Sequence, residues 1–175
     1  MLTGYISATS GTVRICGIDI ARDPEQAKMN IGYLPEIPPL YPELTVEEYL
    51  RYVCAVKGVR CSAVKPHIED ICQKTGLTEM RRRLIGHLSK GYRQRVGLAN
   101  ALIGDPPVII LDEPSVGLDP QQMIEMRQCI RSLGKEHSVL LSSHILSEIS
   151  LICDRVMVID QGKLVAESRL EDLLK

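Results

Sequence analysis

The spacing of hydrophobic residues changes twice along the chain and predicts an α/β protein with a helical segment in its middle. Residues 108–111 and 138–142 are short, largely apolar runs, typical of strands buried on both faces of a parallel sheet. Between residues 43 and 105, apolar side chains instead recur three and four positions apart, which predicts helices. Strands that alternate with helices favour an α/β fold built on a parallel sheet.

Helix start signals sharpen these boundaries. Thr45-Val-Glu-Glu48 has the pattern of a capping box. Asp23 and Asp119 each precede a proline and then a glutamine, which predicts two more helix starts. Prolines crowd residues 35–42 and predict a hinge loop there. We therefore expect a first core part at residues 1–42, a helical subdomain at 43–105 and a second core part at 106–167. A short terminal helix, capped by Ser168, is expected at 168–175.

Composition and charge exclude several classes of function. A hydrophobic share of 45% and a formal net charge of −1 fit a soluble globular protein and give no electrostatic basis for binding nucleic acid. The absence of Trp and Phe also argues against a nucleic-acid reader that stacks bases. The six cysteines lack metal-site spacing, so we expect buried free thiols in a reducing compartment. The sequence predicts neither a signal peptide nor a membrane span.

The first candidate for chemistry is the acid pair Asp112-Glu113, directly after the strand predicted at residues 108–111. Ligands of open parallel sheets bind beyond the carboxyl ends of the strands. Asp112 suits Mg²⁺, because this ion prefers oxygen ligands. Glu113 could orient or deprotonate a water molecule that attacks phosphorus. Taken alone, the pair is equally consistent with a helix cap and a surface acid.

Three further segments carry candidate residues, each with a plain structural alternative. Ser89 and Gly91 open a helix, whose free N–H groups attract anions, but Ser89 is also an ordinary N-cap residue. His144 follows the strand predicted at residues 138–142 and is expected at the same sheet edge as Asp112, where it could equally be a surface residue. Asp119 follows the acid pair closely and could simply cap the next helix.

Together and in this order, the segments resemble the nucleotide-binding domain of ABC transporters. The matching segments are Ile31-Gly-Tyr-Leu-Pro-Glu36 (the strand into the Q-loop), Leu88-Ser-Lys-Gly-Tyr-Arg-Gln-Arg (signature), Ile110-Leu-Asp-Glu-Pro114 (Walker B), Gly117-Leu-Asp-Pro120 (D-loop) and Ser143-His144 (switch histidine). The resemblance covers essentially the whole chain and is strongest to exporter-type and gliding-motility ATPase subunits of bacteria. It implies a P-loop NTPase-type parallel-sheet core with a helical subdomain insert.

The resemblance also implies ATP and Mg²⁺ as cofactors and gives each candidate a role. Asp112 would hold Mg²⁺, Glu113 would act on the attacking water, and His144 would contact the γ-phosphate. Glu36 would be a second, weaker Mg²⁺ ligand, and its loop would relay closure to the membrane subunits. The residues expected to bind nucleotide are Ser89, Gly91, Glu36 and Asp119.

In the family, two such domains sandwich ATP head to tail, so Ser89 and Gly91 would contact ATP held by the partner. The resemblance implies an ATP-hydrolysing subunit of a bacterial ABC transporter. Its partners would be membrane permease subunits and a second nucleotide-binding domain, with no nucleic acid. The expected location is cytoplasmic and peripheral, on the inner face of the cell membrane.

The sequence departs from the family pattern in three ways. Glu36 stands where the family usually has Gln, and Lys90 and Tyr92 replace the usual Gly and Gln of the signature. No Gly-x-x-x-x-Gly-Lys-[Ser/Thr] motif occurs in the 175 residues. The chain thus resembles a family member without its first strands and P-loop, and we expect it to be inactive and poorly soluble alone. The missing strand is expected beside the strand at residues 108–111.

Two alternative functions follow from these departures. One is a non-catalytic regulatory or interaction half-domain that offers its signature segment to a partner ATPase. The other is a soluble ABC ATPase of translation or DNA repair, against which the near-neutral charge and the lack of a second cassette argue. A permease gene beside this one would favour the transporter, and the DNA upstream of Met1 would show whether the P-loop is encoded there.

Overall fold

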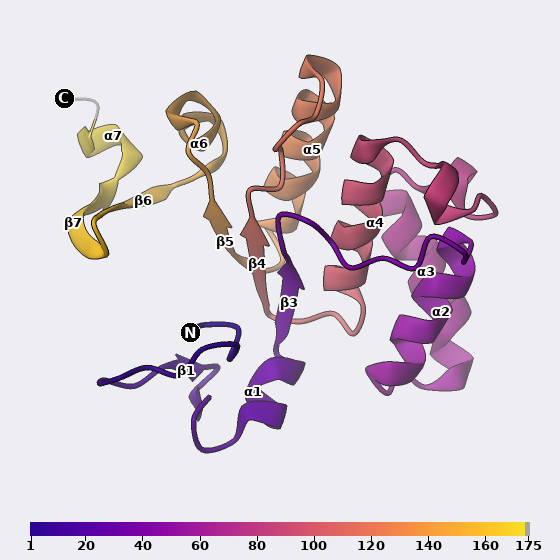
Figure 1. Ribbon diagram of the computed structural model, residues 1–175, viewed down its shortest axis with the longest axis horizontal. Helices are drawn as coiled ribbons and strands as arrows, with labels where there is room; N and C mark the ends of the chain where they lie inside the picture. Colours follow the sequence, from indigo (N-terminus) through magenta and orange to yellow (C-terminus); the bar gives the residue numbers. More distant parts are fainter. Residues whose placement is uncertain (174–175) are drawn as a thin grey trace. The chain divides into compact units, whose positions relative to one another are not determined.

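The computed structural model describes residues 1–173, which fall into two compact units, Met1–Ser142 and the residues from Ser143 onward (Figure 1). No helix among these residues is both long and apolar enough to cross a membrane. The elements of the first unit are β1 (Arg14–Ile15), β2 (Ile18–Asp19), α1 (Pro24–Met29), β3 (Ile31–Leu34), α2 (Val46–Val56), α3 (Cys61–Lys74), the 3-10 helices η1 (Thr78–Met80) and η2 (Ile85–His87), α4 (Lys90–Leu102), β4 (Val108–Asp112), α5 (Pro120–Leu133) and β5 (Ser138–Ser142).

A three-stranded parallel sheet forms the centre of the first unit, in the order β3-β4-β5 (Figure 1). Leu34 of β3 is in register with Leu111 of β4, and Asp112 of β4 is in register with Ser142 of β5. The carboxyl ends of all three strands therefore lie at one edge of the sheet, as the α/β prediction requires. Ile109 and Leu111 of β4 are fully buried and belong to the hydrophobic core.

The sheet order corrects two predictions. The strand at residues 108–111 was expected to lie beside an absent strand, but β4 is hydrogen-bonded to β3 on one side and β5 on the other. That prediction is wrong, because a strand has only two sides and both are occupied. The strand at residues 138–142 was expected to be buried on both faces. Its apolar residues are only half-buried, because β5 lies at an edge of the described sheet.

Helix starts in the first unit follow the predicted caps. The Thr45 backbone N–H donates to Glu48 Oε2 (2.9 Å), and the Glu48 N–H donates to Thr45 Oγ1 (3.3 Å), which completes the predicted capping box. Asp23 accepts from the Gln26 N–H at the start of α1. Helix α4 packs closely on the sheet. A Cβ on Gly32 of β3 would collide with the backbone carbonyl of Ala101 in α4, so the glycine makes this close approach possible. The capping hydrogen bonds at Asp23 and Thr45 confirm the predicted starts of α1 and α2.

The second unit contains α6 (Leu146–Ile152), β6 (Arg155–Asp160), β7 (Lys163–Arg169) and α7 (Leu170–Leu173). Strands β6 and β7 form the predicted antiparallel hairpin. Gln161 and Gly162 both have positive φ at its turn, as a tight hairpin turn requires. Ser168 does not cap the last helix as predicted. It lies within β7, and its hydroxyl donates to the Arg169 carbonyl. The last two residues of the terminal helix predicted at 168–175 lie outside the described residues.

All six cysteines are free, but only some of them are buried. Burial raises the pKa of the Cys72 and Cys129 thiols to about 11, which keeps both protonated near neutral pH. Cys16 and Cys61 are exposed, so the expectation of buried thiols is wrong for them. The reason is position, since Cys16 lies in the turn between β1 and β2 and Cys61 is the first residue of α3.

Candidate functional site

Three polar residues lie at the carboxyl edge of the parallel sheet. Asp112 ends β4, Ser142 ends β5 in register with it, and Glu36 lies in an exposed bend two residues after β3. The charge of Asp112 affects Tyr33 on the neighbouring strand β3. Burial, and to a lesser degree the Asp112 carboxylate, raise the pKa of Tyr33 on β3. Two of the predicted site residues, Asp112 and Glu36, therefore follow neighbouring strands at the same edge of the sheet, where ligands of such folds bind.

Ser142 connects both members of the acid pair. Its hydroxyl donates a hydrogen bond to Asp112 Oδ1 (2.5 Å) and accepts one from the Glu113 backbone N–H (3.1 Å). The sequence alone does not point to Ser142, because a serine at the end of a strand carries no local signal of its own. The signal that could have found it is the alignment of two parallel strand ends, one carrying Asp112 and the other Ser142.

The acid pair leads into a tight turn. Glu113 has a positive φ of 47°, a backbone conformation that residues with side chains rarely adopt. The N–H of Val116 donates to the Glu113 carbonyl (3.1 Å), so the chain reverses directly after β4. Asp119 then caps α5 and accepts a hydrogen bond from the Gln122 N–H (2.9 Å). Asp119 is therefore a helix cap, as one of its two interpretations predicted. A nucleotide-binding role for Asp119 stays a prediction.

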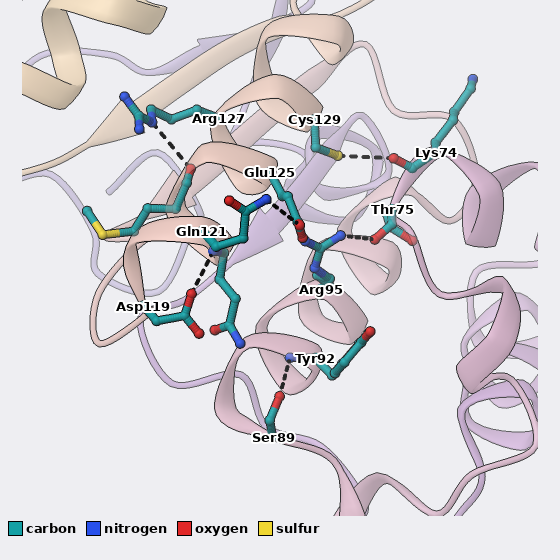
Figure 2. Close-up of polar contacts among 12 residues, drawn as sticks. Lys74, Thr75, Ser89, Tyr92, Arg95, Asp119, Gln121, Glu125, Arg127 and Cys129 are labelled. Atoms are coloured by element: carbon teal, nitrogen blue, oxygen red, sulfur yellow. Dashed lines mark hydrogen bonds and ion pairs between the residues drawn. The ribbon is translucent and has the colours of Figure 1, made fainter.

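The start of α4 lies against the turn that precedes α5. Ser89 is the N-cap of α4 and accepts from the Tyr92 N–H (3.4 Å), as Figure 2 shows. Gly91 is buried because the amide group of Gln122 occupies the space that a Cβ would need. The ammonium end of Lys90 lies against Gly117 in the same way. The segments that resemble the signature and the D-loop are thus in contact.

Polar contacts further along α4 and α5 reinforce this packing (Figure 2). Arg95 of α4 forms an ion pair with Glu125 of α5, and its guanidinium also donates to the Thr75 carbonyl (3.2 Å) after α3. The thiol of Cys129 on α5 donates to the Lys74 carbonyl (3.2 Å) at the end of α3. Three helices that were predicted separately are therefore tied together by one guanidinium group and one thiol.

His144 belongs to the second unit. It is exposed and lies in the bend that precedes α6, where the Ile145 N–H donates to Ser143 Oγ (3.1 Å). Its expected place beside Asp112 stays a prediction.

The residues at the sheet edge fit a Mg²⁺ ion that is also bound by a phosphate ligand. Among the described residues, no group of three or more His, Cys, Asp or Glu side chains could hold a metal ion. Asp112 offers carboxylate oxygens beside the Ser142 hydroxyl. Mg²⁺ is commonly bound by one or two carboxylates together with substrate phosphates. The donor set therefore fits Mg²⁺ that arrives with a phosphate ligand and does not fit an ion held by protein ligands alone.

A parallel sheet with a carboxylate at its carboxyl edge is the arrangement of α/β nucleotide-binding proteins. Comparison with known proteins shows which family of nucleotide-binding proteins this chain belongs to. Residues 1–116 match the family model described as ABC transporter. The chain therefore belongs to the ABC transporter family, which confirms both the predicted resemblance and the α/β fold class, and the family is one of ATP-hydrolysing enzymes.

Several known proteins are similar along almost the whole chain. Bacitracin transport ATP-binding protein BcrA of Bacillus licheniformis is 38% identical over 177 residues, which cover 100% of this chain and 57% of BcrA. ABC transporter ATP-binding protein NatA of Bacillus subtilis is 34% identical over 175 residues, covering 99% of this chain and 71% of NatA. A solved ATP-binding subunit of an ABC transporter has a TM-score of 0.85 at 30% identity, covering 98% of this chain and 72% of that one. The chain spans little more than half the length of BcrA.

Proposed function

We propose that this chain is part of the ATP-hydrolysing subunit of a bacterial ABC transporter, which drives transport through membrane permease subunits. The observation that carries the proposal is the acid pair Asp112-Glu113 at the carboxyl end of the central parallel strand, in a chain of the ABC transporter family. The transport role named for BcrA supports the same function here. The proposed location is the cytoplasmic, inner face of the cell membrane, with no nucleic-acid partner.

The proposed catalytic residues divide the chemistry of hydrolysis between them. Asp112 holds Mg²⁺ together with the ATP phosphates, and Mg²⁺ supplies neutralisation of the charge that develops on them. The Glu113 carboxylate accepts a hydrogen bond or a proton from the attacking water. His144 donates a hydrogen bond to the γ-phosphate. Glu36, in its exposed bend after β3, assists at the magnesium side and relays closure to the permease.

The start of α4 serves a second nucleotide-binding domain in a head-to-tail dimer. Ser89 is exposed at this helix start, where unpaired N–H groups and the positive end of the helix dipole favour a phosphate. It belongs to the helical subdomain proposed at residues 43–105, whereas Asp112 belongs to the core proposed at residues 1–42 and 106–167. Ser89 and Gly91 therefore contact the partner's ATP, and Asp119 supports the same interface from the start of α5.

The decisive experiment replaces Glu113 in the full-length subunit. We expect Glu113→Gln to lower steady-state ATP hydrolysis by about 100-fold or more, because the amide keeps the shape of the side chain but loses the charge that acts on water. ATP binding, measured by calorimetry, should stay within about threefold of wild type, since its ground-state contacts are kept. A turnover within about twofold of wild type would contradict the role of Glu113.

Glu25→Gln is the matched control. Glu25 is an exposed acid in the first turn of α1, and α1 leads into the amino end of β3, which is the opposite edge of the sheet. The same change of charge there should leave hydrolysis unchanged. If both variants lose activity equally, the effect comes from net charge and not from the acid pair.

One observation favours a second candidate function. The helix start at Ser89 and Gly91 is fully formed within this chain, with Ser89 as the N-cap that accepts from the Tyr92 N–H. A chain of this kind could act as a non-catalytic half-domain that completes the ATP site of a partner. Stimulation of an intact partner's hydrolysis by this chain, lost in Gly91→Asp, would favour this function over that of a complete subunit.

A further inference from the structure

The hydroxyl of Ser142 is hydrogen-bonded to both members of the acid pair. A serine hydroxyl has one hydrogen to donate and lone pairs to accept with. In Ser142 the hydrogen goes to Asp112 Oδ1 (2.5 Å), and the oxygen accepts the Glu113 N–H (3.1 Å). Because β4 and β5 run parallel with Asp112 opposite Ser142, the backbone itself places the hydroxyl at this point. Strand pairing alone does not require it, since serine offers little to sheet packing compared with a β-branched residue.

The bond to Asp112 fixes one oxygen of a carboxylate that would otherwise rotate. A carboxylate at the end of a strand can turn about its terminal bond, whose preference is broad. The hydrogen bond from Ser142 holds Oδ1 toward β5, and Oδ2 takes no part in that bond. Mg²⁺ demands near-ideal geometry from its ligands, so an oriented carboxylate binds it better than a rotating one. The hydroxyl therefore prepares Asp112 for the metal.

The bond from Glu113 acts on the backbone of the second acid. Glu113 has a φ of 47°, in the left-handed region that residues with side chains seldom occupy. Its N–H donates to Ser142 Oγ, which supports this conformation from the neighbouring strand. The direction in which a side chain leaves the backbone follows from φ and ψ. The same hydroxyl thus influences where both the metal ligand and the residue that acts on water are presented.

We propose that Ser142 is a positioning residue of the hydrolytic site, which orients the Asp112 carboxylate for Mg²⁺ and holds the backbone of Glu113. The inference rests on the proposed ATPase function. The residue acts through the two acids and does not itself touch the nucleotide. Any substitution that keeps a hydroxyl at this strand end should keep its effect, and any that removes it should loosen both acids at once.

The test compares Ser142→Ala, Ser142→Thr and Ser138→Ala in the full-length subunit. Ser142→Ala should lower kcat by about tenfold and raise the Mg²⁺ concentration for half-maximal activity by about threefold or more, with KM for ATP within about twofold, because orientation and not substrate contact is lost. Ser142→Thr should restore at least half of the activity, since threonine keeps the hydroxyl. Ser138→Ala is the matched control, because Ser138 is an exposed serine at the opposite end of the same strand.

A second measurement does not depend on hydrolysis. Amide hydrogen exchange at Glu113, followed by NMR without nucleotide, should be about tenfold faster in Ser142→Ala than in wild type or Ser138→Ala, because the N–H loses an acceptor. Unchanged exchange at Glu113, or an unchanged Mg²⁺ requirement, would overturn the proposal. A wild-type protein that does not hydrolyse ATP would instead overturn the proposed function, while the exchange measurement still decides whether Ser142 holds the acid pair.

Discussion

At the scale of single residues, two glycines mark close approaches that differ in what they approach. A Cβ on Gly32 would meet the backbone carbonyl of Ala101, whereas a Cβ on Gly91 would meet the flexible end of the Gln122 side chain. Backbone cannot yield without separating β3 from α4, but a glutamine side chain can rotate away. Replacing glycine by alanine should therefore cost much stability at Gly32 and little at Gly91.

We expect Gly32→Ala to destabilise the full-length protein by about 3 kcal/mol, at the upper end of overpacking costs, and to lower Tm by about 6 °C or more. Gly91→Ala should change stability by no more than about 1 kcal/mol, because the gain in helix propensity offsets the movement of Gln122. Thermal melting followed by circular dichroism checks both variants. Equal shifts in Tm would contradict the distinction between backbone and side-chain contact.

At the scale of elements, Arg95 joins three helices. Its guanidinium is largely covered, with the side chain 14% exposed, and it bonds both to Glu125 of α5 and to the Thr75 carbonyl after α3 (Figure 2). We expect Arg95→Ala to cost about 1–3 kcal/mol, because the Thr75 carbonyl and the exposed Glu125 carboxylate lose a charged, largely covered donor together. Glu125→Ala should cost less than Arg95→Ala, since Arg95 keeps its bond to Thr75. Thermal melting measures both.

Arg131→Ala provides the control for this prediction. Arg131 lies on the exposed side of the same helix, α5, and loses the same charge when replaced. Its substitution should stay within about 0.5 kcal/mol of wild type, as is usual for exposed positions. A loss of stability in Arg131→Ala equal to that in Arg95→Ala would show that charge or helix propensity, and not the three-helix contact, carries the effect.

The elements also show which parts of the fold a sequence can predict. The caps at Thr45 and Asp119 depend on residues within four positions, so their patterns predict helix starts that the structure confirms. The neighbours of β4 depend on pairing between distant strands, and the prediction of an absent strand beside it is wrong. Ser142 was missed for the same reason, since its role arises only when β5 is placed beside β4. Local signals predicted most elements, with the cap expected at Ser168 as an exception, and did not predict the order of the strands.

At the scale of the whole molecule, the proposed site is divided between two subunits. Ser89 and Gly91 lie at the start of α4, whereas Asp112 lies at the carboxyl end of β4, where Ser142 holds it. In full-length protein, we expect Gly91→Asp homodimers and P-loop-mutant homodimers both to be inactive. A mixture of the two should recover hydrolysis, up to about half per heterodimer, because one composite site is then intact. Heterodimers without hydrolysis would contradict the placement of Ser89 and Gly91 in the partner's site.

The last prediction concerns the 175-residue chain by itself, which should not bind Mg-ATP with useful affinity. A P-loop supplies the backbone N–H groups and the lysine that hold the β- and γ-phosphates, and no such motif occurs in these residues. Asp112, Glu113 and Glu36 would instead present carboxylates to a polyanion, and Mg²⁺ alone offers no preorganised donors. Isothermal titration calorimetry should find no saturable binding up to about 1 mM, equivalent to a binding free energy weaker than about −4 kcal/mol. The full-length subunit is the positive control under the same buffer and Mg²⁺ concentration. A low-micromolar Kd for the 175-residue chain would contradict the prediction, because the acid edge and the start of α4 would then suffice to hold the phosphates.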